Sequence, residues 1–144
     1  MSFFQKKYLK KKLGDNDELA KYIFREKELR ADGSIRPANL KPRQGEQLSL
    51  FEITGISHDG ICKHGRDYAN NPAKGRIHIG YGKFKHHSFV KLELRTIYDN
   101  KPPRHMSVEF PEEPERRREL SKALAGQLVS SGNEGKNKYF TSCL

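Results

Sequence analysis

The sequence predicts a single α+β domain whose three- to four-stranded, mostly antiparallel sheet is covered by a C-terminal helix. Three observations support this fold class. The length of 144 residues fits one domain. Short stretches of alternating polar and apolar residues fill the middle of the chain, and a helical pattern follows them. A strand-rich middle followed by a helix favours α+β over a doubly wound sheet, in which strands and helices alternate along the chain.

We expect three parts in this chain. Residues 1–13 form a basic N-terminal arm, residues 14–129 the α+β domain, and residues 130–144 a flexible C-terminal tail rich in Ser, Gly, Asn and Lys. Only 34% of residues are hydrophobic and Trp is absent, so the core is expected to be small. No apolar run approaches membrane-spanning length, and no membrane partner is predicted.

The predicted elements follow local patterns. In chain order they are a helix over 15–25, a connection over 30–47, a strand over 47–54, a helix over 58–69, strands over 76–81, 89–98 and 106–110, and a helix over 112–129. Leu19 and Ile23, four residues apart, favour the first helix. The 30–47 segment is rich in Pro and Gly, and so long a connection is expected to cover a sheet edge or a site. Ser57 is the predicted N-cap of the second helix.

The later elements have similar support. Ile77 and Ile79 lie on one face of the 76–81 strand, whereas the 89–98 strand leaves a helical turn possible at its start. The segment Asp99–Pro103 has strong turn residues and leads into the alternating strand that Pro111 ends. The last helix has acidic residues in its first turn, and its apolar stripe consists of Leu120, Ala123, Leu124 and Leu128.

The charge of the chain points to an anionic partner. The formal net charge is +10 and the isoelectric point about 9.7, which favours nucleic acid or an anionic surface. Two acid-free blocks concentrate the positive charge. The arm carries Lys6, Lys7, Lys10, Lys11 and Lys12, and the 74–91 block carries Lys74, Arg76, Lys83, Lys85 and Lys91. Tyr81 and Phe84 lie among the second set and are predicted to stack on bases. The alternative is that these aromatic residues belong to the core and that the lysines form a solvated face.

A catalytic pair is the second prediction. Pro102 and Pro103 stiffen the chain in front of Arg104 and His105, which would hold both side chains in place. In metal-independent phosphodiester cleavage a histidine moves a proton while a cation stabilises the developing charge. Such a site needs a second histidine, for which His78 is the candidate. The alternative for each histidine is a structural hydrogen-bonding role.

The other candidate site patterns have less support in the sequence. Cys62 with His64, and His86 with His87, lack the further ligands that a zinc site requires, so no metal or cofactor is predicted. Glu93 and Arg95 are only distantly similar to half of a metal-dependent nuclease motif. Two cysteines, Cys62 and Cys143, are too few for a disulfide framework, and a reducing cytoplasm is expected.

Several segments together resemble a group of small uncharacterised bacterial proteins. The shared pattern covers roughly residues 20–129 and includes Leu48–Phe51, Gly55–Ser57, Asp99–His105 with its Pro-Pro-Arg-His sequence, Val108, Pro111 and the terminal helix. The resemblance implies a compact α/β chain and a bacterial cytoplasm, and it implies no activity.

The functional prediction is a binding module for RNA or DNA that reads mainly phosphates, with Arg104 among its contacts. The alternative is a metal-independent ribonuclease or phosphoesterase centred on Arg104 and His105. A third hypothesis is an accessory subunit of a larger assembly. The oligomeric state is not predicted.

Overall fold

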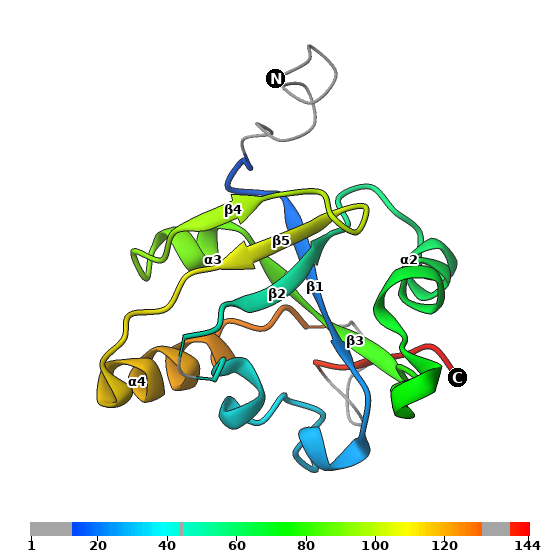
Figure 1. Ribbon diagram of the computed structural model, residues 1–144, viewed down its shortest axis with the longest axis horizontal. Helices are drawn as coiled ribbons and strands as arrows, with labels where there is room; N and C mark the ends of the chain where they lie inside the picture. The colour runs from blue at the N-terminus through cyan, green and yellow to red at the C-terminus, as the bar shows by residue number, and fades with distance from the viewer. Residues whose placement is uncertain (1–12, 44, 131–138) are drawn as a thin grey trace.

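The fold is a six-stranded antiparallel sheet with helices packed against it (Figure 1). The computed structural model describes residues 13–43, 45–130 and 139–144. The strands are β1 (Glu18–Ile23), β2 (Leu48–Glu52), β3 (Gly80–Lys85), β4 (Thr96–Tyr98), β5 (His105–Val108) and β6 (Thr141–Ser142). Their order across the sheet is β4-β5-β2-β1-β3-β6. The α+β class with an antiparallel sheet and a C-terminal helix is confirmed, but the predicted strand number of three to four is too low.

Strand β1 was predicted as a helix. It lies in the middle of the sheet, where Leu19 pairs with Phe84 of β3 and Ala20 pairs with Phe51 of β2. Because both faces of a central strand are covered, apolar residues occupy both faces and the polar alternation disappears. A spacing of four then fits a strand as well as a helix.

The helices are α2 (His58–His64), α3 (His87–Val90) and α4 (Pro114–Ala125), and a π-helical turn (Gly65–Ala69) continues α2. The predicted cap is present, because Ser57 Oγ accepts a hydrogen bond from the Gly60 backbone N–H at 3.1 Å. Helix α3 and the following turn occupy the first part of the predicted 89–98 strand, so β4 is only three residues long. The predicted 76–81 strand instead begins at Gly80 and continues to Lys85.

The sheet separates two apolar clusters. The larger one packs against α3 and α4 and includes Leu19, Phe84, Phe89 and Leu124. The smaller one packs against α2, and its members are Ala20, Tyr22, Phe51, Ile53, Ile61, Cys62 and Tyr81. Figure 1 shows α2 and α4 far apart, beside different ends of the sheet. Residues that alternate along β1 and β2 therefore belong to different clusters, and this alternation fixes the register.

The last residues of the chain belong to the sheet. Thr141 pairs with Tyr81 at the outer edge of β3, and Phe140 is buried in the larger cluster. A Cβ at Gly80 would collide with the Thr141 carbonyl oxygen, so β6 can approach this closely only beside glycine. The predicted flexible tail therefore does not extend over 139–144, and its 131–138 portion lies outside the described residues.

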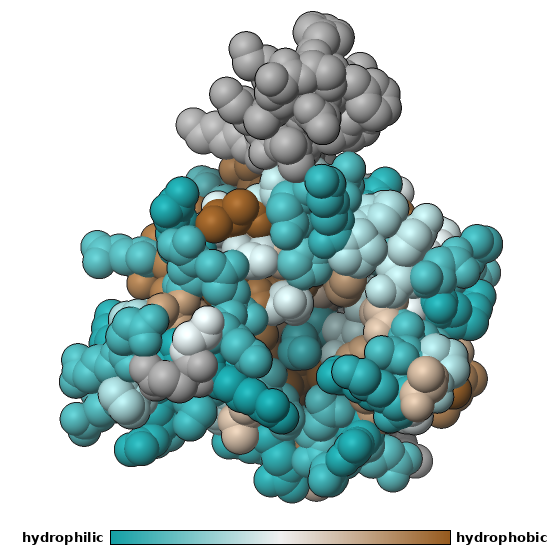
Figure 2. Space-filling view, viewed as in Figure 1, coloured by the Kyte–Doolittle hydropathy of each residue, from teal (hydrophilic) through white to brown (hydrophobic). Residues whose placement is uncertain are grey.

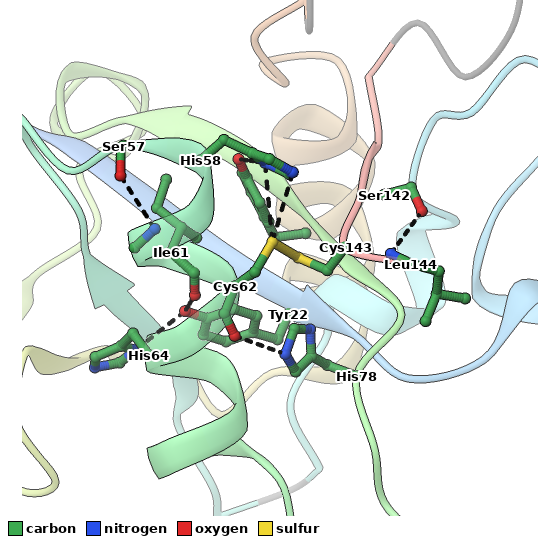
Figure 3. The surroundings of a disulfide bond; sticks show 12 residues. Tyr22, Ser57, His58, Ile61, Cys62, His64, His78, Ser142, Cys143 and Leu144 are labelled. Carbon is green, nitrogen blue, oxygen red and sulfur yellow. Dashed lines mark hydrogen bonds between the residues drawn. A yellow bond between two sulfur atoms is a disulfide. The ribbon is translucent and has the colours of Figure 1, made fainter.

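A disulfide joins the residue that follows β6 to α2. Cys62 and Cys143 are bonded across a sequence separation of 81 residues (Figure 3). Disulfides persist mainly in oxidising compartments, whereas the sequence favours a reducing one. Among the described residues, no helix has the length and apolar character needed to cross a membrane.

Candidate functional site

The turn between β4 and β5, which we call the 99–105 corner, has an unusual backbone. Asn100 and Arg104 have φ values of 56° and 70°, and the Lys101–Pro102 peptide bond is cis. Asn100 Oδ1 accepts a hydrogen bond from the Arg104 backbone N–H at 2.8 Å. Asn tolerates the left-handed conformation better than most residues. For Arg104 the conformation is uncommon, which indicates that its surroundings determine it.

Arg104 is paired with a buried carboxylate. Its Nη1 lies 3.1 Å from Oε2 of Glu52, whose side chain is 2% exposed. The other oxygen of this carboxylate accepts a hydrogen bond from the Thr54 backbone N–H at 2.9 Å. A buried carboxylate is costly without a cationic partner. The charge of Arg104, which was predicted to contact phosphate, therefore stabilises Glu52.

His105 is held by a second carboxylate. Its Nδ1 lies 2.7 Å from Asp99 Oδ1, and its side chain is 14% exposed. The ring packs edge-on against Phe51, with the ring centroids 5.5 Å apart. A carboxylate on one ring nitrogen fixes the orientation of an imidazole and leaves the other nitrogen for proton transfer. Asp99 was not predicted as a site residue.

The predicted pairing of His78 with His105 is not formed. His78 contacts the Cys62 carbonyl through Nε2 at 3.1 Å and packs against Tyr22 (Figure 3). The histidine that reaches the corner is His64, whose Nε2 lies 2.8 Å from the Pro103 carbonyl oxygen. His64 was considered only as a metal ligand, and its place beside the corner depends on how α2 packs against the sheet.

Both of these histidines contact polar groups inside the fold. His64 is buried and its other nitrogen lies 3.0 Å from the Tyr22 hydroxyl. Burial lowers the pKa of His64 and of His78, so both imidazoles favour the neutral form. Within the residues that the structure describes, no group of three or more His, Cys, Asp or Glu side chains could hold a metal ion.

The 74–91 block does not provide stacking rings. Tyr81 is 3% exposed and Phe84 is completely buried, so both belong to the core and neither presents a ring face to a base. Lys83 lies 3.2 Å from Glu18, which neutralises its charge. The remaining cations of the block, Lys74, Arg76, Lys85 and Lys91, are exposed. The lysines predicted in the arm lie outside the described residues.

A basic pocket lies at a place that the sequence did not predict. Its volume is about 340 Å³, and it is lined by Phe24, Arg25, Lys27, Glu28, Asn39, Arg43, Gly75 and Arg76. These residues come from the end of β1, from the long connection before β2 and from the turn before β3. In the space-filling view this face of the molecule is largely hydrophilic and is hollowed near its centre (Figure 2). Of the predicted binding residues that the structure describes, only Arg76 lines the pocket.

Positive charge dominates the basic pocket. In the described part of the chain, its four cations, Arg25, Lys27, Arg43 and Arg76, form no ion pair with a carboxylate. The one acid in the lining, Glu28, accepts hydrogen bonds from the backbone N–H groups of Phe24 and Arg25 at 2.9 and 2.6 Å. The Arg76 guanidinium lies 4.4 Å from the centroid of the Phe24 ring, which holds it in place.

A fifth cation lies beside the basic pocket. Lys21 is partly buried on β1 between Leu19 and Ile23. Its charge interacts with those of Glu28 and Arg76, which both line the pocket. Burial lowers the pKa of the Lys21 ammonium, and the repulsion by Arg76 acts in the same direction. Among the described residues, Lys21 Nζ has neither a hydrogen bond nor an ion pair.

The sequence alone does not reveal this pocket, because its cations lie far apart in the chain. Arg25 and Arg43 are separated by the long connection, and Arg76 follows much later. The one usable observation was that a connection as long as 30–47 often covers a site. Comparison of the chain with family models, curated proteins and solved structures finds no match, so its geometry alone carries the functional argument.

Proposed function

We propose that the protein binds nucleic acid through its phosphate groups and that the basic pocket is the principal contact. The observation that carries this proposal is the convergence of four cations for which no carboxylate in the described part of the chain is a partner. Unpaired cations held close together repel one another, and an anion removes that repulsion. Three of the four are arginines, whose planar guanidinium groups bind phosphate in a bidentate manner.

The composition of the basic pocket favours a charged ligand over an apolar one. Pockets for small organic ligands are lined mainly by apolar and aromatic side chains. Here Phe24 is the one aromatic residue in the lining, and it supports a guanidinium. The net charge of +10 adds a long-range attraction that increases the rate of association with a polyanion.

The test is a titration of short RNA and DNA, single- and double-stranded, at several salt concentrations. The pocket variant is Arg43→Gln combined with Arg76→Gln, because both side chains are exposed and neither is needed for an ion pair. The matched control is Lys85→Gln combined with Lys91→Gln, which removes the same charge from exposed sites outside the pocket.

We expect the pocket variant to bind more weakly than the control. If both arginines contact phosphates, the slope of log affinity against log salt falls by about 1.4 for single strands and about 1.8 for duplexes. Failure of the native protein to bind any of these nucleic acids at low salt would contradict the proposal. So would equal losses in the pocket variant and the control.

A second candidate function is metal-independent phosphodiester cleavage at His105. The observation that favours it is the 2.7 Å contact between His105 and Asp99, which orients the imidazole. Arg104 is less suited to the role first assigned to it, because its guanidinium is paired with Glu52. His78 lies elsewhere, where its Nε2 contacts the Cys62 carbonyl oxygen.

The enzymatic candidate is tested with mixed RNA in the presence of a metal chelator. Cleavage by the native protein, with a large loss in both His105→Ala and Asp99→Asn, would support it. If cleavage is absent, or if His105→Ala retains it, His105 has only a structural role.

A further inference from the structure

The shape of the basic pocket limits the kind of phosphate that can enter it. The lining residues come from three separate parts of the chain and surround a half-open recess of about 340 Å³. An internal phosphodiester continues into nucleotides on both sides, so it is better matched to an open groove. A phosphate at the end of a strand is joined on one side only and can enter a recess with its free oxygens first.

The charge of the basic pocket also exceeds what one phosphodiester needs. Four cations line it against a single carboxylate, and Lys21 adds a fifth cation beside it. An internal phosphodiester carries one negative charge. A phosphate monoester carries about −1.5 to −2 at pH 7 and has three terminal oxygens that accept strong hydrogen bonds.

Lys21 is the residue that most needs such a ligand. Lys21 is partly buried on β1, where Leu19 and Ile23 on the same face are completely buried, and no described side chain pairs with its ammonium. A partly buried charge without a partner is unfavourable, and a nearby dianion would compensate it. Glu28 gives only partial compensation, since one of its carboxylate oxygens binds two backbone N–H groups.

We infer that the basic pocket binds the terminal phosphate monoester of a nucleic-acid strand, in preference to an internal phosphodiester. This inference rests on the proposed function and specifies which chemical group of the nucleic acid the pocket binds. A monoester can lie at either end of a strand, so the experiment separates the two sources.

The experiment compares three short single strands of one sequence, with a 5′-phosphate, with a 3′-phosphate, or with hydroxyl groups at both ends. We expect at least one phosphorylated strand to bind about tenfold more tightly than the hydroxyl-ended strand, as additional charge-assisted hydrogen bonds would give. The preference should shrink between about pH 7.5 and about pH 5.5, because the second pKa of a phosphate monoester is about 6. Inorganic phosphate should compete with the phosphorylated strand.

Lys21→Met is the decisive variant, because Met keeps much of the lysine stem and removes the charge. It should lose most of the preference for the phosphorylated end and keep the affinity for the hydroxyl-ended strand. Lys83→Met is the control, since its ammonium is paired with Glu18. A thermal melt of each variant shows whether the fold is retained, and Lys21→Gln replaces Lys21→Met if it is not.

The results distinguish failure of the inference from failure of the proposed function. Equal binding of all three strands overturns the inference and leaves the proposed function intact. A preference for a phosphorylated end that Lys21→Met retains unchanged also overturns the role of this pocket. If no strand binds, the proposed function fails and the inference fails with it.

Discussion

The 99–105 corner and the basic pocket both contain arginines, and they use them in opposite ways. At the corner, Arg104 lies 3.1 Å from the buried carboxylate of Glu52. In the pocket, Arg25, Arg43 and Arg76 have no carboxylate partner among the described residues. The same side chain therefore stabilises the fold at one site and remains available for a ligand at the other. Whether a cation binds a ligand depends on the charge beside it more than on its exposure.

This difference predicts that mutations will separate stability from binding. Changes at the corner should alter the free energy of unfolding with little effect on nucleic-acid affinity. Changes in the pocket should do the reverse. The largest expected effect concerns α2, which carries His64 to the Pro103 carbonyl of the corner and is joined by the disulfide to the residue that follows β6.

Cys143→Ser should lower the free energy of unfolding by about 4 kcal/mol, because a cross-link over a loop of this length restricts the unfolded chain. Nucleic-acid affinity should change little, since neither cysteine lines the pocket. Denaturant titration with and without a reducing agent measures the effect. As a control, the reduced native protein should have the same free energy of unfolding as the variant. Equal free energies of unfolding for the oxidised and the reduced native protein would contradict the prediction.

Arg104→Met should lower the free energy of unfolding by about 3 kcal/mol, at the lower end of the range for a broken buried ion pair because Arg104 is 39% exposed. The backbone φ of residue 104 is equally unfavourable for Met, so the change reports the lost charge. The control is the double variant Glu52→Gln with Arg104→Met, which should recover part of the loss. A loss of affinity as large as that of the pocket variant would contradict the separation of the two sites.

Acid should destabilise the fold through its buried histidines. His64, His78 and His86 all have lowered pKa values because burial disfavours the charged imidazole. The unfolded chain then binds more protons than the folded one, so their contribution to stability is present above about pH 6.5 and is lost as the pH falls toward the folded pKa values. His78→Gln should reduce the slope of stability against pH by less than about 1.4 kcal/mol per pH unit. An unchanged slope would contradict the burial of a neutral His78.

The sequence predicted the features that depend on local pattern. The Ser57 cap and a C-terminal helix follow from residue types at adjacent positions, and the structure confirms both, although α4 spans Pro114–Ala125 and is shorter than the predicted 112–129. The helix predicted through Leu19 and Ile23 was wrong because burial on both faces of a central strand removes the alternation that identifies strands. The positions of the binding residues were harder to predict. Tyr81 lies among cations in the sequence, as base-stacking residues do, but tertiary packing buries it in the smaller cluster beside α2.

The smallest expected effect separates the basic pocket from the predicted 74–91 block. Lys83→Gln and Arg76→Gln remove the same charge from neighbouring parts of the chain. Lys83 is already paired with Glu18 at 3.2 Å, and both side chains are about one-third exposed, so the pair contributes at most about 1 kcal/mol to stability. Removing Lys83 also frees the Glu18 carboxylate, whose repulsion of phosphate is weakened by solvent at this exposure.

We therefore expect Lys83→Gln to change affinity by less than about twofold, since surface pairs of this kind have small effects. Arg76→Gln should weaken binding more, because no carboxylate among residues 13–43, 45–130 and 139–144 pairs with its guanidinium, which is held over Phe24 in the recess. The measurement is a pair of titrations on the same oligonucleotide at two salt concentrations. If the two variants lose equal affinity, then position in the recess contributes nothing and the protein attracts nucleic acid by its overall charge alone.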